Sequence, residues 1–79
     1  MEDRIECEVN DGILKIFINH KLHLCVSLSE IVCIDSWIHV PTILNRYYID
    51  ITFSNNWTIL EYKSRKNWEE VLRLINKYV

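Results

Sequence analysis

The sequence predicts an α+β protein, in which an antiparallel sheet or partial barrel of about six strands is capped by one C-terminal amphipathic helix. Of the 79 residues, 21 are β-branched, and alanine, the best helix former, is absent. Branching at Cβ restricts χ1 and suits a pleated, half-buried surface, so the composition favours strands. The spacing of apolar residues changes to the helical period only near the end of the chain. A chain of this length forms a single domain, residues 1–79, with one modest core.

Residues 1–27 predict a meander of three strands. Residues 5–9 alternate apolar and acidic side chains, and residues 10–12 form a short connection holding the only glycine, where such hairpins need a left-handed residue. Residues 13–19 and 22–26 supply the second and third strands. The apolar side chains expected on their inner face are Leu14, Ile16, Ile18, Leu22, Leu24 and Val26.

Three further strands are expected in the second half of the chain. Residues 31–38 form the fourth strand, and the pattern then lapses over residues 39–45, around the only proline. Residues 47–53 and 57–62 alternate again and supply the fifth and sixth strands. Because residues 54–56 can form a turn, the last two strands should pair as a hairpin.

The end of the chain predicts a helix over residues 65–78. Ser64 stands at the position of an N-cap, and Glu69 and Arg73 are spaced for an i,i+4 ion pair on the wet side. A single amphipathic helix must lay its stripe on an apolar surface, and the inner faces of the strands provide one. The stripe consists of Trp68, Val71, Leu72, Ile75 and Val79.

Six strands in hairpin order, followed by one terminal helix with an inward tryptophan, resemble the pleckstrin-homology-like superfold. Residues 47–62 and 67–75 carry this resemblance, as an order of elements. It implies a bent sandwich or partial barrel plugged by the helix, in a superfold that serves lipid, phosphotyrosine and plain protein recognition. Phosphoinositide-binding members look as though they use a basic first hairpin, whereas residues 6–12 are acidic here. The resemblance therefore implies a protein-recognition version.

Several classes of protein are excluded or disfavoured. One glycine cannot build a GxGxxG turn or a P-loop, because both need several positions where backbone approaches phosphate. The acidic start and short uncharged runs favour an unexported, cytoplasmic protein that does not enter a membrane. Cys7, Cys25 and Cys33 form no CxxC pair, so we expect small buried hydrophobes in a reducing compartment.

Catalysis and metal binding are not expected. The cysteines lie in the middle of strands rather than at a helix N-terminus, where a thiolate would be stabilised, so we predict no enzyme. His20, His23 and Cys25 are close in sequence and could share a zinc ion, but their spacing matches no standard finger or ribbon. We therefore predict no metal and no cofactor.

The charge distribution suggests a second kind of site. Residues 1–12 carry a net charge of −4 and residues 60–79 a net charge of +2, while the whole chain carries −2. This balance argues against duplex nucleic acid as the main partner. Bases crowd the start of the predicted helix, where a cation is unfavourable unless an anion binds there. The alternative function is therefore binding of a small anionic ligand or nucleotide at Lys63, Ser64, Arg65 and Lys66.

The segment around the only proline is the leading candidate. A connection in so small a domain should be polar, yet this one is apolar and is flanked by aromatic residues, as protein interfaces are. The residues expected to bind another protein are Trp37, His39, Val40, Ile43, Leu44 and Tyr48. The open alternative is that residues 39–45 fold back as a lid on an incomplete barrel.

The expected function is that of a small non-enzymatic protein-binding module, which docks through this apolar loop or through a sheet edge. A homodimer stays an open alternative to a different partner. Small size and a composition rich in isoleucine, asparagine, lysine and tyrosine favour a bacterial or phage accessory protein. An inhibitor protein is one example of this class.

Overall fold

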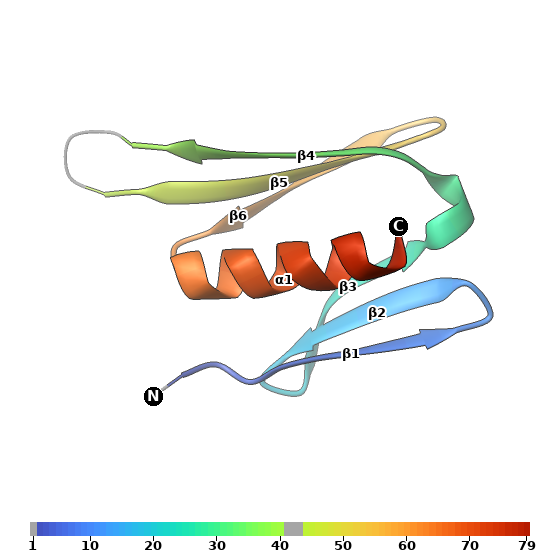
Figure 1. Cartoon of the computed structure of the whole chain (residues 1–79), viewed down its shortest axis with the longest axis horizontal. Coiled ribbons are helices and arrows are strands. Elements are labelled where there is room, and N and C mark those ends of the chain that lie inside the picture. The colour runs from blue at the N-terminus through green and yellow to red at the C-terminus, as the bar shows by residue number, and fades with distance from the viewer. Residues whose placement is uncertain (1, 41–43) are drawn as a thin grey trace.

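The computed structural model describes residues 2–40 and 44–79, and within them two antiparallel three-stranded sheets and one α-helix are present (Figure 1). The α+β class is confirmed, and the described strands do not close into a barrel. The first sheet holds β1 (Ile5–Asn10), β2 (Ile13–Ile18) and β3 (Lys21–Ser27) in that order. A short 3₁₀ turn, η1 (Leu28–Glu30), leads into the second sheet. That sheet holds β4 (Ile31–His39), β5 (Arg46–Phe53) and β6 (Trp57–Tyr62), and α1 (Arg65–Tyr78) follows it.

Both connections in the first sheet are tight two-residue hairpins. Asn10 pairs with Ile13, so the first loop contains only Asp11 and Gly12, at φ 54° and 76°. Positive φ at both central residues is the signature of a type I′ turn, whose twist matches that of the strands. The predicted glycine hairpin is thus confirmed, with two residues in the loop instead of three. The loop of 19–20, joining β2 to β3, also has positive φ at both residues.

A β-bulge in β3 overturns one expectation about its faces. Ile16 pairs with Leu24 and Phe17 with Leu22, so His23 is the extra residue on β3. Because of this extra residue, Leu22 before the bulge and Leu24 after it lie on opposite faces, where unbroken alternation would put them on the same one. Leu22, predicted to face the core, is 57% exposed, whereas Leu24 is buried as expected.

The helix has the predicted bounds, and Ser64 is its N-cap. The Ser64 hydroxyl accepts a hydrogen bond from the backbone N–H of Asn67 at 3.2 Å, which satisfies one of the free donors of the first turn. The predicted ion pair between Glu69 and Arg73 is wrong. Glu69 instead accepts from Arg65 one turn earlier, and Arg73 pairs with Glu70. Each glutamate had a base within reach on either side, so spacing alone did not select the partner.

The core lies where the helix meets the two sheets. In Figure 1 α1 runs between the second sheet and the hairpin of β1 and β2, and it contacts β1, β5 and β6. Val79, predicted for the buried stripe, is 61% exposed, because it lies beyond the last helical residue; Leu74 is buried instead. The buried residues come from both sheets and from the helix: Leu14, Ile16, Leu24, Val26, Tyr47, Ile49, Ile51, Tyr62, Trp68, Val71, Leu74 and Ile75.

The cysteines are less buried than predicted. Cys25 and Cys33 are exposed and Cys7 is half-buried, and all three are free thiols. Cys33 pairs with Thr52 on the side of the second sheet opposite the core, so an apolar sequence context did not imply an inward side chain. Among the residues that the structure describes, no helix is long and apolar enough to cross a membrane.

Candidate functional site

The side of the second sheet away from the helix carries most of the exposed aromatic surface. Tyr47, Ile49 and Ile51 of β5 are buried toward the helix, so the alternate residues of that strand point the other way. In Figure 1 the helix and the first sheet both lie on one side of the second sheet. Strand register places residues of β4 and β6 beside the outward residues of β5. We name this surface the outer face. Its residues come from all three strands: Cys33, Asp35, Trp37, His39, Arg46, Tyr48, Asp50, Thr52, Trp57, Ile59 and Glu61.

A stacked aromatic pair stands on the outer face. Trp37 and Tyr48 are directly opposite each other on β4 and β5, with ring centroids 5.1 Å apart and ring planes inclined by 17°. Trp37 is 41% exposed; Trp57 and Ile59 of β6 are 65% and 50% exposed. Large apolar side chains gathered on one open sheet face are a surface that a partner can bury.

Tyr48 is held in place from two directions. Its hydroxyl donates to Oε2 of Glu61 at 3.1 Å, and its backbone carbonyl accepts from Nε1 of Trp68 at 3.0 Å. Partial desolvation, together with the hydrogen bond to the Glu61 carboxylate, raises the pKa of Tyr48, so the phenol stays protonated and can donate. Tyr48 is therefore tied to β6 through its side chain and to α1 through its backbone carbonyl.

Two carboxylates face each other in the middle of the outer face. Asp35 of β4 is the register partner of Asp50 of β5. Asp35 Oδ1 accepts from the backbone N–H of Ser36 at 3.2 Å, whereas Asp50 Oδ1 is shielded from solvent and has no hydrogen-bond partner among the described residues. The nearby base Arg46 lies 3.8 Å from Glu61 (Nε to Oε1). Within residues 2–40 and 44–79, neither aspartate forms an ion pair.

The structure brings together part of the predicted protein-binding set. Trp37 and Tyr48 lie on the outer face, and His39 is exposed at the end of β4 opposite Arg46. Val40 and Leu44 are 68% and 58% exposed. Ile43 lies outside the described residues, as does the middle of the segment that was expected to form either an exposed loop or a lid.

Sequence reasoning missed Trp57, Ile59, Asp35 and Asp50 as members of the same surface. The available signal was the alternation along residues 57–62, which is compatible with Trp57 and Ile59 on a common face. What joins them to Trp37 is pairing across β5, and no local pattern shows that register.

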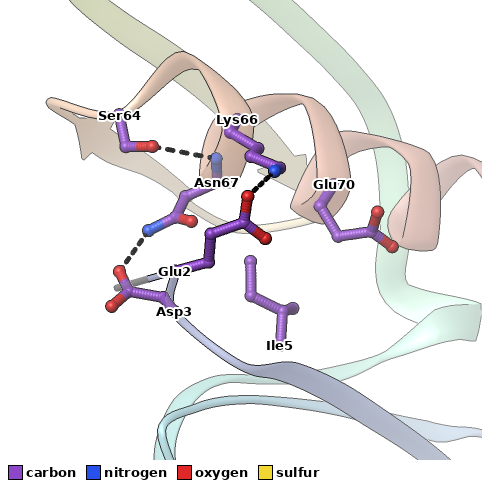
Figure 2. Close-up of a pocket in the computed structure, with 7 residues that line it drawn as sticks. All are labelled: Glu2, Asp3, Ile5, Ser64, Lys66, Asn67 and Glu70. Carbon is purple, nitrogen blue, oxygen red and sulfur yellow. Dashed lines mark hydrogen bonds and ion pairs between the residues drawn. The ribbon is translucent and has the colours of Figure 1, made fainter.

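The basic cluster predicted to bind anions is already in contact with carboxylates. Arg65 Nε lies 2.7 Å from Glu69 Oε1, and Lys66 pairs with Glu2 (Figure 2). The Ser64 hydroxyl is engaged as the helix cap, and Lys63 is exposed. A pocket of about 510 Å³ adjoins this corner. It is lined by Glu2, Asp3, Ile5, Ser64, Lys66, Asn67 and Glu70, so three of its seven lining residues are acidic.

Asp3 closes one side of this pocket through hydrogen bonds. Its carboxylate accepts from Asn67 Nδ2 at 2.6 Å, as Figure 2 shows, and from Asn19 Nδ2 at 2.9 Å. The hydrogen bonds from Asn19 and then Asn67 lower the pKa of Asp3. This network ties the segment before β1 to the turn after β2 and to the start of α1, which gives the pocket wall a structural role.

The histidines and cysteines considered for zinc are dispersed. His20 lies 3.5 Å from Glu6 (Nδ1 to Oε1), and His23 contacts Tyr62 in the interior. No group of three or more histidine, cysteine, aspartate or glutamate side chains in the described part of the chain could hold a metal ion.

Comparisons of this chain with protein-family models, with curated proteins and with solved structures find no match. The two antiparallel sheets and the C-terminal helix are compatible with the resemblance to the pleckstrin-homology-like superfold, which stays a prediction.

Proposed function

We propose that the protein is a small non-enzymatic binding module that docks on another protein through the outer face. One observation carries this proposal: the Trp37–Tyr48 stack lies on the same sheet face as exposed Ile59 and Trp57, which pair with β5 two and four residues beyond Tyr48, on the side opposite the helix. Large rigid aromatic side chains supply much of the binding energy in protein interfaces. Because the Tyr48 hydroxyl is already hydrogen-bonded to Glu61, little freedom of this side chain would be lost when a partner covers the stack.

The free edge of β4 borders the outer face, and a sheet edge is the second docking route that the sequence suggested. β4 is an edge strand and pairs with β5, so its other side presents backbone groups. Val32 on this strand is 67% exposed, and Val40 lies just beyond its end. A partner on the outer face can therefore gain backbone hydrogen bonds from β4 and apolar contact from Val40 and Leu44.

Anion binding at the start of the helix is the weaker proposal. Arg65 and Lys66 each contact a carboxylate, and an incoming anion would have to displace those contacts. The adjoining pocket adds further negative charge through Asp3 and Glu70. No contact in this region favours an anion over the existing arrangement.

The test compares a double variant of the outer face with a control variant that removes an exposed apolar side chain from the other sheet. We expect Trp37→Ala with Trp57→Ala to abolish capture of the partner from host extract, and Leu22→Ala, exposed on the first sheet, to leave it unchanged. Capture is quantified by mass spectrometry, and the purified partner is then titrated to give Kd. Circular dichroism verifies that both variants fold.

An unchanged Kd in the double tryptophan variant would overturn the proposal. Analytical ultracentrifugation of the free protein addresses the homodimer. If the wild type is a dimer and the tryptophan variant is a monomer, the outer face binds a second copy instead of a different protein.

A further inference from the structure

We infer that the outer face accepts a protein partner presenting an arginine side chain, whose guanidinium group reaches the carboxylates of Asp35 and Asp50. The inference rests on the proposed function and specifies the chemistry of the partner. It starts from a surface with exposed aromatic rings whose centre carries two carboxylates. No cation of the described residues pairs with either of them, because Arg46, on the same side of β5, lies beside Glu61 instead.

The charge at the centre of the face has no compensation within the described residues. Asp35 and Asp50 are direct cross-strand neighbours, a placement that is unfavourable for like charges. One oxygen of Asp50 is already withdrawn from water and has no hydrogen-bond donor. A charge partly removed from water interacts more strongly with an added counter-charge, because the local dielectric is lower.

These charges exclude several partners that the aromatic surface alone would allow. A purely apolar partner would bury both carboxylates without compensation, which is strongly unfavourable. Phosphate groups of nucleic acid or of an anionic membrane would be repelled by Asp35 and Asp50. A second copy docked with its own outer face over this one would bring four carboxylates together, so the face also disfavours a symmetric homodimer centred here.

Arginine fits the surroundings better than lysine. Trp37 and Tyr48 each lie two residues along the strand from an aspartate on the same face, about 7 Å away. A planar guanidinium can stack on an aromatic ring while donating to a carboxylate, and its fork of donors can serve two acceptors. An ammonium group is more strongly hydrated and offers no planar surface for stacking.

The experiment uses the whole chain and a probe that does not depend on knowing the partner. N-acetyl-arginine methylamide is titrated into the isotope-labelled protein, and NMR follows the indole signals of Trp37 and Trp57. The lysine and glutamate analogues are titrated in parallel. We expect saturable shifts with the arginine analogue, smaller shifts with lysine, and none with glutamate.

The decisive variant is Asp35→Asn with Asp50→Asn, which keeps side-chain shape and removes both charges. Its matched control is Glu6→Gln with Glu8→Gln, an equal charge change on the first sheet. We expect the aspartate variant to weaken arginine binding roughly fivefold or more, as for a lost charge-assisted contact, and the glutamate variant to leave it unchanged.

Failure of this inference can be told from failure of the proposed function. Equal binding of arginine by wild type and aspartate variant, or equal shifts with the lysine analogue, would overturn the arginine assignment. The proposed function would still stand if the tryptophan variant loses the captured partner. If the tryptophan variant retains that partner, the proposed function fails and the inference fails with it.

Discussion

The imidazole Nε2 of His23 lies 2.5 Å from the hydroxyl of Tyr62, and this hydrogen bond joins the two sheets. His23 is the bulged residue of β3, and Tyr62 is the last residue of β6. The rings meet edge to face, with centroids 5.3 Å apart. Burial lowers the pKa of His23 and raises that of Tyr62, so both side chains are neutral at pH 7. The bulge thus converts an outward position into a polar contact inside the protein.

Acidification is expected to destabilise the protein through His23. Its pKa in the folded state lies below the ordinary value of 6.5, so the unfolded chain takes up the proton first. The contribution of His23 to stability is therefore full above about pH 6.5 and falls as the pH drops below that value. The Tm should decrease as the pH is lowered from 8 to 5, and His23→Gln should make this dependence of Tm on pH less steep.

A second histidine provides the control for this assignment. His39 is exposed at the end of β4. His39→Gln should retain the wild-type pH profile of Tm. A His23→Gln profile as steep as that of the wild type would show that other groups cause the acid sensitivity.

Removing the Tyr62 hydroxyl should destabilise the fold without changing ring packing. In Tyr62→Phe the half-buried imidazole of His23 loses its hydrogen-bond partner, which we expect to lower the free energy of unfolding by about 1–2 kcal/mol. Urea denaturation measures the change. Tyr78→Phe, at the exposed end of α1, is the control and should remain near the wild type. Equal midpoints for the two variants would contradict a stabilising role for the bond.

Trp68 connects the core to the outer face, so its indole N–H should matter for stability. Nε1 donates to the carbonyl of Tyr48, and the ring packs against Tyr47 at a centroid distance of 5.4 Å. Trp68→Phe should lower the free energy of unfolding by about 1–3 kcal/mol, because the carbonyl loses a donor and a cavity remains. Trp57→Phe, on the exposed side, should change it little. Denaturant titration of both variants provides the comparison. Similar losses of unfolding free energy in the two variants would argue against a stabilising role for the bond from Trp68 to the Tyr48 carbonyl.

The order and type of the elements were predictable because their signals are local. Alternation marked the strands, a change of period and a serine cap marked the helix, and glycine marked the first turn. The bulge at His23 was not predictable, because a one-residue slip depends on how β3 pairs with β2. The same limitation explains Leu22, which the bulge leaves on the exposed side.

The candidate site was predictable only where its residues are close in sequence. Trp37 and Tyr48 flank the apolar segment and were both identified. Trp57, Ile59 and Asp50 join them through register across β5, which is a tertiary property. The exposure of Cys33 was likewise undetermined, because alternation divides a strand into two faces without saying which one the helix covers.

A stability measurement can separate a structural role of Asp50 from a binding role. Because Asp50 faces Asp35 and one of its oxygens has no donor among the described residues, Asp50→Asn should raise the free energy of unfolding by about 0.2–1 kcal/mol. Glu8, opposite Lys15 on the first sheet, is the matched contrast, and Glu8→Gln should leave stability unchanged or lower it. Urea denaturation of both variants tests the difference in sign. If Asp50→Asn destabilised the protein, the carboxylate would serve the fold itself, and the argument for a cationic partner would lose its basis. A gain in stability would instead indicate that the free protein carries an unfavourable charge pair, which an arginine from a partner would relieve.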